Sequence, residues 1–163
     1  MWITGVIGLA FLAAASYTWW YIEHLSPVKM VKTLEGVAWM KEDPAFSPTV
    51  QITLDGYFDP GDNQFKGTLQ MNGRVYSDML LQSGFLATHV DGKILRRLGQ
   101  VYFDQDLGHL AWAVPQSELP PELTNPLLPE AKVWLIAPAS SREEAGSLRQ
   151  TLEDRFSAEL RLK

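Results

Sequence analysis

The chain has 163 residues, of which 46% are hydrophobic and 20% are charged, and its formal net charge is −5 at pH 7. This acidic balance, with no concentrated run of basic residues, excludes nucleic acid as the main partner. The absence of cysteine excludes disulfides and any zinc site built on thiolates.

The first 22 residues carry no charged side chain, and most of them are apolar. A helix of that length would rise roughly 30 Å, which is the thickness of a bilayer's hydrocarbon core. Trp2 near one end and the aromatic residues within 17–21 at the other are typical of interfacial belts. Because no basic region precedes the apolar run, a retained signal anchor is favoured over a cleaved signal peptide. We therefore expect a transmembrane anchor at 1–22, with the lipid bilayer as its partner.

Residues 23–49 are expected to form a juxtamembrane helix or linker. Within 26–43, apolar residues recur at spacings of three and four, which predicts one apolar helical face. Pro27 suits the first turn of such a helix, with Ser26 as its cap. This face would pack on the adjoining domain or lie on the membrane surface.

From Val50 onward the apolar period changes to two, which is typical of strands with one solvated face. Asn72-Gly73 predicts a two-residue hairpin, since a type I′ turn needs positive φ at both positions. The predicted strands form an antiparallel meander and cover 50–55, 65–71, 75–81, 85–90, 98–103 and 110–114.

The last third of the chain changes character. Residues 115–129 are proline-rich and predict an extended strap, and 133–136 predict a short buried strand. Ser141 and Glu144 form a capping box ahead of a helix, with Ser140 and Glu143 as the alternative register. Alternation in 158–163 suggests a final strand. The expected fold is α+β: a transmembrane helix, then a β-rich domain at 50–163 whose meander sheet is covered by the C-terminal helix.

No pattern in the chain identifies chemistry. Its three histidines, His24, His89 and His109, lack metal-ligand spacing, and no nucleophile or phosphate-binding motif is present. The acidic loop 59–63 groups oxygen ligands that would suit calcium, but it lacks the ordered Asp spacing and the distal Glu of a calcium loop. We therefore assign no catalytic, cofactor-binding or metal residues, and expect no cofactor.

Three segments carry a resemblance to a known group. These are the run from Phe65 to Tyr76 with its hairpin turn, the run from Leu98 to Tyr102, and 137–145. Together they resemble small single-pass membrane-anchored proteins of Gram-positive spore-forming bacteria, a group without an assigned activity. Lys29 and Lys32 favour a cytoplasmic domain, whereas the resemblance implies an extracytoplasmic one, which we expect here.

The leading functional hypothesis is a non-catalytic binding or assembly module of the cell envelope, with an envelope protein as partner. One alternative is an envelope hydrolase that uses carboxylates of the two acidic hairpin loops: Asp59, Asp62, Asp104 and Asp106. Another is a domain that binds a lipid or other apolar ligand in a pocket under the C-terminal helix.

Overall fold

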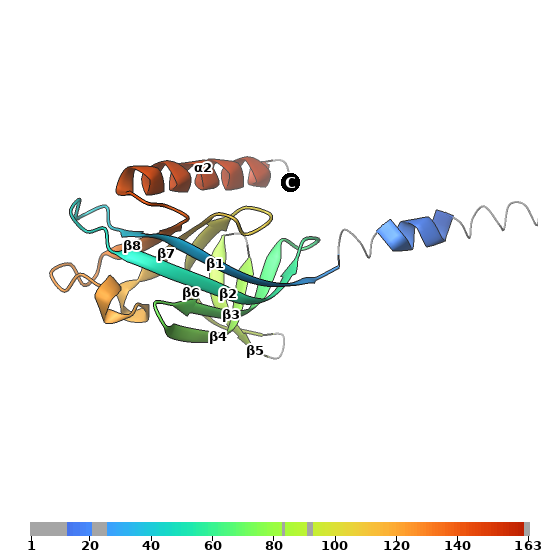
Figure 1. Ribbon diagram of the computed structural model, residues 1–163, viewed down its shortest axis with the longest axis horizontal. Helices are drawn as coiled ribbons and strands as arrows, with labels where there is room; N and C mark the ends of the chain where they lie inside the picture. The colour runs from blue at the N-terminus through green and yellow to red at the C-terminus, as the bar shows by residue number, and fades with distance from the viewer. Residues whose placement is uncertain (1–12, 21–25, 83, 91–92, 162–163) are drawn as a thin grey trace, which may run out of the picture.

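A computed structural model describes residues 13–20, 26–82, 84–90 and 93–161. Eight antiparallel strands, each hydrogen-bonded to its neighbours in chain order, close into a barrel, and one long helix, α2 (Arg142–Arg161), lies across its outside (Figure 1). The strands are β1 (Val28–Trp39), β2 (Thr49–Asp59), β3 (Gln64–Met71), β4 (Arg74–Gln82), β5 (Phe85–Val90), β6 (Lys93–Phe103), β7 (Leu110–Pro115) and β8 (Lys132–Ala137).

The apolar alternation read from the sequence places one face of each strand inside the barrel. In β2, Val50, Ile52 and Leu54 are buried. Gln51, which lies between the first two, and Asp55, which follows the last, are exposed. An eight-stranded barrel has an interior that side chains can fill. Large and almost completely buried side chains fill the interior of this barrel, among them Trp112, Phe65, Leu69, Met79, Leu81 and Leu86.

The local signals for turns and caps are confirmed. Asn72 and Gly73 join β3 to β4 with φ of 45° and 86°, the positive values that a type I′ turn requires. At the start of α2, the Ser141 hydroxyl accepts the Glu144 N–H at 3.2 Å, so Ser141 is the N-cap. The Glu144 carboxylate reaches back to Ser140 rather than to the cap itself.

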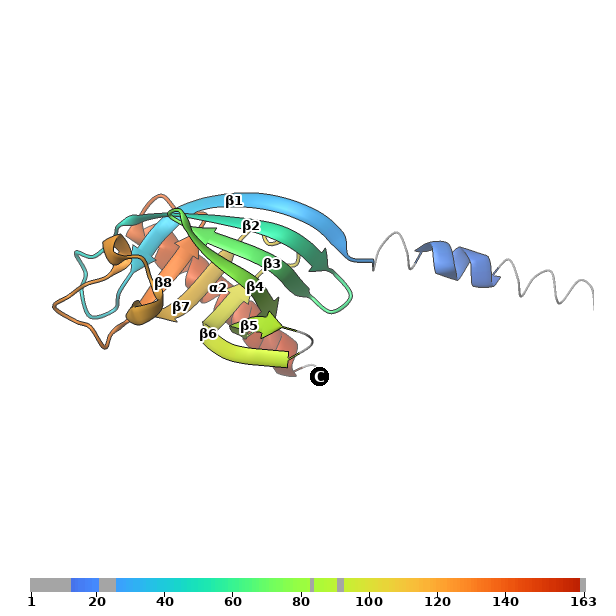
Figure 2. The same cartoon turned by 90° about the horizontal axis from the view of Figure 1, so that it is seen from below.

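Helix α2 covers the outer face of four strands, β1, β6, β7 and β8 (Figure 2). Ala145 and Leu152 on the helix are buried against Val37 and Ile136 of the barrel. Tyr102 extends this second apolar layer, stacking on Trp134 with ring centroids 6.1 Å apart. The predicted strand at 158–163 is wrong over its described part, because α2 continues through Arg161.

The predicted open meander sheet is also wrong, because β1 and β8 pair and close the barrel. The residues that close it were expected to form a juxtamembrane helix, but they form β1. Inside the barrel, Leu34 and Ala38 join the main core, while Val37 between them is buried outside by α2. A strand buried on both faces has apolar residues at consecutive positions, and these mimic helical spacing.

The predicted transmembrane helix is contradicted. Residues 13–20 are helical, while the rest of the predicted span at 1–22 lies outside the described residues. Among the helices that the structure describes, none combines the length and the apolar character needed to cross a membrane. A single-pass protein of the cell membrane, anchored in the bilayer by this helix, is therefore not supported, and neither is the placement of its domain outside the cell.

Candidate functional site

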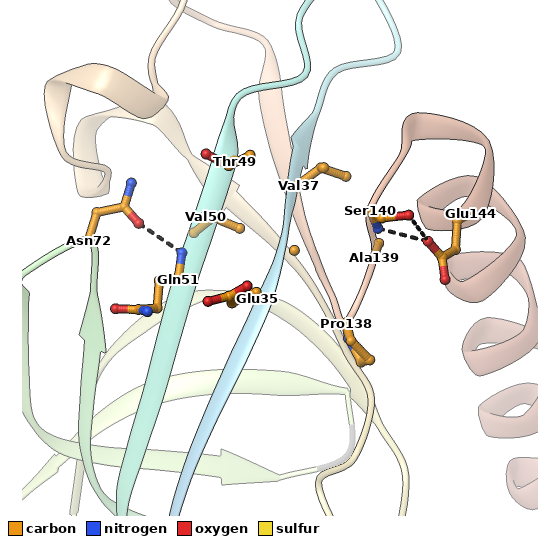
Figure 3. Close-up of a pocket in the computed structure, with 11 residues that line it drawn as sticks. Glu35, Val37, Thr49, Val50, Gln51, Asn72, Pro138, Ala139, Ser140 and Glu144 are labelled. Carbon is orange, nitrogen blue, oxygen red and sulfur yellow. Dashed lines mark hydrogen bonds between the residues drawn. The ribbon is translucent and has the colours of Figure 1, made fainter.

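A groove of about 620 Å³ lies on the outer surface of the barrel, where β1 and β2 pass the start of α2 (Figure 3). Three chain segments form it: the paired strands β1 and β2, the turn after β3, and the segment that leads from β8 into the helix. Its volume falls within the range of roughly 300–1,000 Å³ that is common for small-molecule sites.

The groove exists because β8 leaves β1 early. Val37 is the first residue of β1 that pairs with β8, and the chain turns away from β1 at Pro138. One further hydrogen bond, from the Ala139 N–H to the Glu35 carbonyl at 3.2 Å, holds the departing segment beside β1. Residues 138–140 therefore form one wall of the groove.

The opposite side of the groove is fixed by the turn between β3 and β4. The Asn72 side chain accepts the Gln51 N–H at 2.8 Å, and the Asn72 N–H donates to the Gln51 carbonyl at 3.1 Å. Figure 3 shows the first of these bonds, from the Gln51 N–H to the Asn72 side chain beside β2, at the far side from Ser140. These two bonds use both backbone groups of Gln51, so its side chain is the part that remains for a ligand.

Glu144 lies in the first turn of α2 and lines the groove. Its carboxylate accepts the Ser140 N–H at 2.7 Å and the Ser140 hydroxyl at 2.8 Å. Both hydrogen bonds lower the pKa of Glu144, and the one from the backbone N–H has the larger effect. The carboxylate is therefore charged at neutral pH.

The lining combines apolar and acidic groups. The apolar lining residues are Val37, Val50, Pro138 and Ala139, of which only Pro138 is exposed, and Glu35 lies on the exposed face of β1. Among the described lining residues, two carry carboxylates and none is Lys, Arg or His. Such a site favours ligands that donate hydrogen bonds or carry positive charge, and disfavours anions.

The space beneath α2, where an apolar pocket was expected, is filled by side chains. The Arg149 guanidinium lies 5.1 Å from the Trp134 ring centroid and 5.7 Å from that of Trp39. It also pairs with Glu153 at 2.7 Å. Arg149 thus packs between the helix and two aromatic rings of the barrel.

The acidic loops do not form one carboxylate cluster. Asp104 and Asp106 line a second hollow of about 460 Å³, together with Arg155 and Glu159 of α2. Asp59 and Asp62 are not among its lining residues. Asp59 instead accepts the N–H groups of Gly61 and Asp62 in its own loop, as expected of a turn aspartate.

Asp104 is paired with His109, whose Nδ1 lies 2.5 Å from the Asp104 carboxylate. Burial raises the pKa of Asp104, but hydrogen bonds from the His109 side chain and backbone outweigh it, and the net pKa is lowered. A carboxyl that stays ionised cannot serve as the general acid of a hydrolase at neutral pH. Among the described residues, no group of three His, Asp or Glu is placed to hold a metal ion.

The groove residues were not foreseen as a site. In the sequence, Gln51 appears as an ordinary solvated strand position, and Glu35 and Thr49 fall within the predicted juxtamembrane helix or linker. Ser140 and Glu144 appear as helix-capping residues. Nothing in their local pattern signals that they meet. Of the other histidines, His89 lies on β5, and His24 is outside the described residues. Comparison with protein-family models, curated proteins and solved structures gives no match for this chain.

Proposed function

We propose that the protein is a binding protein for a small, partly apolar ligand with a cationic or hydrogen-bond-donating group, held in the groove between β1, β2 and the start of α2. The observation that carries this proposal is the groove itself, with an exposed apolar residue at Pro138 and the carboxylates of Glu35 and Glu144. A closed eight-stranded barrel is compatible with binding lipids or other apolar ligands.

The barrel interior is a poorer location for such a ligand. Trp112, Phe65 and Leu81 have no solvent contact and belong to one continuous cluster inside the barrel. A ligand placed there would have to displace close-packed side chains, and cores resist even small volume changes. Binding at the outer groove needs no such rearrangement.

The test uses three amphiphiles that share an octyl chain: octylamine, octanol and octanoate. Binding to the full chain is measured by the rise in unfolding temperature, since a ligand that binds only the folded state stabilises it by about 2.7 kcal/mol at 100 times its Kd. We expect the order of stabilisation to be octylamine, then octanol, then octanoate. The reason is that the carboxylates attract the ammonium group and repel the octanoate carboxylate.

A blocking variant localises the effect. Thr49 is an exposed groove residue, so Thr49→Trp fills the groove without changing the core. Thr151→Trp, on the exposed side of α2 and away from the groove lining, is the matched control. We expect the shift with octylamine to be lost in Thr49→Trp and kept in Thr151→Trp. Equal shifts in both variants, or no shift with any of the three compounds, would contradict the proposal.

A further inference from the structure

We propose that β1 is also a docking edge for a second copy of this chain, with the β1 strands of two molecules pairing antiparallel about a two-fold axis at Val31. The barrel is closed unevenly. Strand β1 pairs with β2 from Val28 to Val37 but with β8 only from Val37 to Trp39. Among the described strands, most of the length of β1 therefore has a partner on one side only.

One hydrogen bond of Glu35 fixes the direction in which the backbone groups along β1 point. The Glu35 carbonyl points to the β8 side, because it accepts the Ala139 N–H. In an antiparallel strand, both backbone groups of one residue point to the same side, and the side alternates along the chain. Lys29, Val31 and Thr33 therefore direct their N–H and C=O groups away from β2.

Two contacts on β2 support this assignment independently. Gln51, which lies opposite Glu35, uses its backbone N–H and C=O on the β3 side, with Asn72. The hydroxyls of Thr33 and Thr53 lie 3.0 Å apart, as expected for facing residues that do not exchange backbone bonds, since their side chains are closer.

The three edge residues are open to a partner. Lys29, Val31 and Thr33 are all exposed, and within the described part of the chain none of them makes a backbone hydrogen bond on the β8 side. An exposed row of unpaired N–H and C=O groups is a template for pairing with another strand.

The sequence of this edge suits a second copy of itself. With Val31 opposite its own symmetry mate, Lys29 lies opposite Thr33 of the other copy, and all three residues exchange backbone bonds. Val31 is 66% exposed and would bury its side chain against its mate. Lys29 would lie diagonally from Glu35 of the other copy, within reach of a long side chain. The two-fold axis produces this pair of opposite charges twice.

Disulfide trapping tests the register, because the chain contains no native cysteine. Facing residues that exchange backbone bonds have Cα atoms about 5.5 Å apart, which permits a disulfide. Val31→Cys in the full chain should therefore form a covalent dimer under mild oxidation. The matched control is Val75→Cys on β4, which replaces a valine of similar exposure, 58%. We expect Val31→Cys to cross-link at least about tenfold faster, since pairing raises the effective thiol concentration.

A mixing experiment separates this register from contact through other surfaces. Lys29→Cys and Thr33→Cys should cross-link poorly as separate proteins and well as a mixture, because only the mixed pair faces across the two-fold axis. Equal rates for Val31→Cys and Val75→Cys would overturn the proposal. So would Lys29→Cys or Thr33→Cys proteins that cross-link alone as fast as their mixture.

Discussion

Gly36 is the residue of β1 whose substitution should most directly disrupt the pairing of β1 with β8, which closes the barrel. A Cβ atom added at Gly36 would lie 2.1 Å from the Ile136 carbonyl oxygen and 2.8 Å from the Ala137 Cα, both backbone atoms of β8. Ordinary contact begins near 3.4 Å, so β8 would have to move by more than 1 Å. Only three residue pairs join β1 to β8, and this shift would disrupt them.

We therefore expect Gly36→Ala to lower the free energy of unfolding by about 3 kcal/mol or more, which is at or above the upper end of the usual cost of overpacking. Urea unfolding followed by circular dichroism measures it, and the midpoint should fall by more than about 1 M for an m-value of 1–3 kcal/mol/M. Gly146→Ala on α2 is the control: no atom of the described residues lies within 4 Å of its Cβ position, so helix propensity alone should stabilise the protein by up to about 1 kcal/mol. A Gly36→Ala midpoint equal to that of the unsubstituted chain would refute the argument.

Four further substitutions, at three positions, test the core and the helix start. Trp112→Ala should lower the free energy of unfolding by about 3–5 kcal/mol, because it leaves a cavity in the core. Trp112→Phe should lower it by less than about 2 kcal/mol, because this change also removes a buried N–H that has no acceptor among the described residues. Denaturant midpoints measure both effects. Arg142→Ala should cost about 1–3 kcal/mol, since its guanidinium donates to the carbonyl of buried Met40; a loss below 0.5 kcal/mol in the same assay would count against this role. Glu144→Gln should destabilise the protein at pH 7 and have no effect in acid. The pKa of Glu144 in the folded protein lies below its ordinary value of 4.5. The charged carboxylate therefore stabilises the fold above pH 4.5, and this contribution disappears as the pH falls through the folded-state pKa. An effect of Glu144→Gln that persisted at pH 2 would contradict this assignment.

The strands between Val50 and Val114 and the start of the C-terminal helix could be predicted because their signals are local. Alternation of apolar residues reports one buried face, and turn residues such as Asn72 and Gly73 report positive φ. The N-cap at Ser141 follows from a four-residue pattern. The resemblance to proteins of spore-forming bacteria stays a prediction, as does the division of the chain at 22 and 49.

The candidate site could not be predicted in the same way. Glu35 and Ser140 are more than one hundred residues apart in the chain, and they meet only because β1 passes the end of β8. The proposed docking edge has the same origin. Within the described part of the chain, the backbone of the exposed residue Val31 has no partner on the β8 side because β8 ends early, and no pattern within β1 itself encodes that length.

The sequence by itself determined where most strands and turns lie and where α2 begins, since each of these depends on neighbours a few residues away. Only the tertiary structure decided that the sheet closes, that 28–39 is a strand, and that the groove lies outside a filled barrel. The physical reason is that β1 gains burial on both faces only after β8 and α2 have packed against it. Local spacing then favours a helix, whereas long-range pairing with β2 and β8 stabilises a strand.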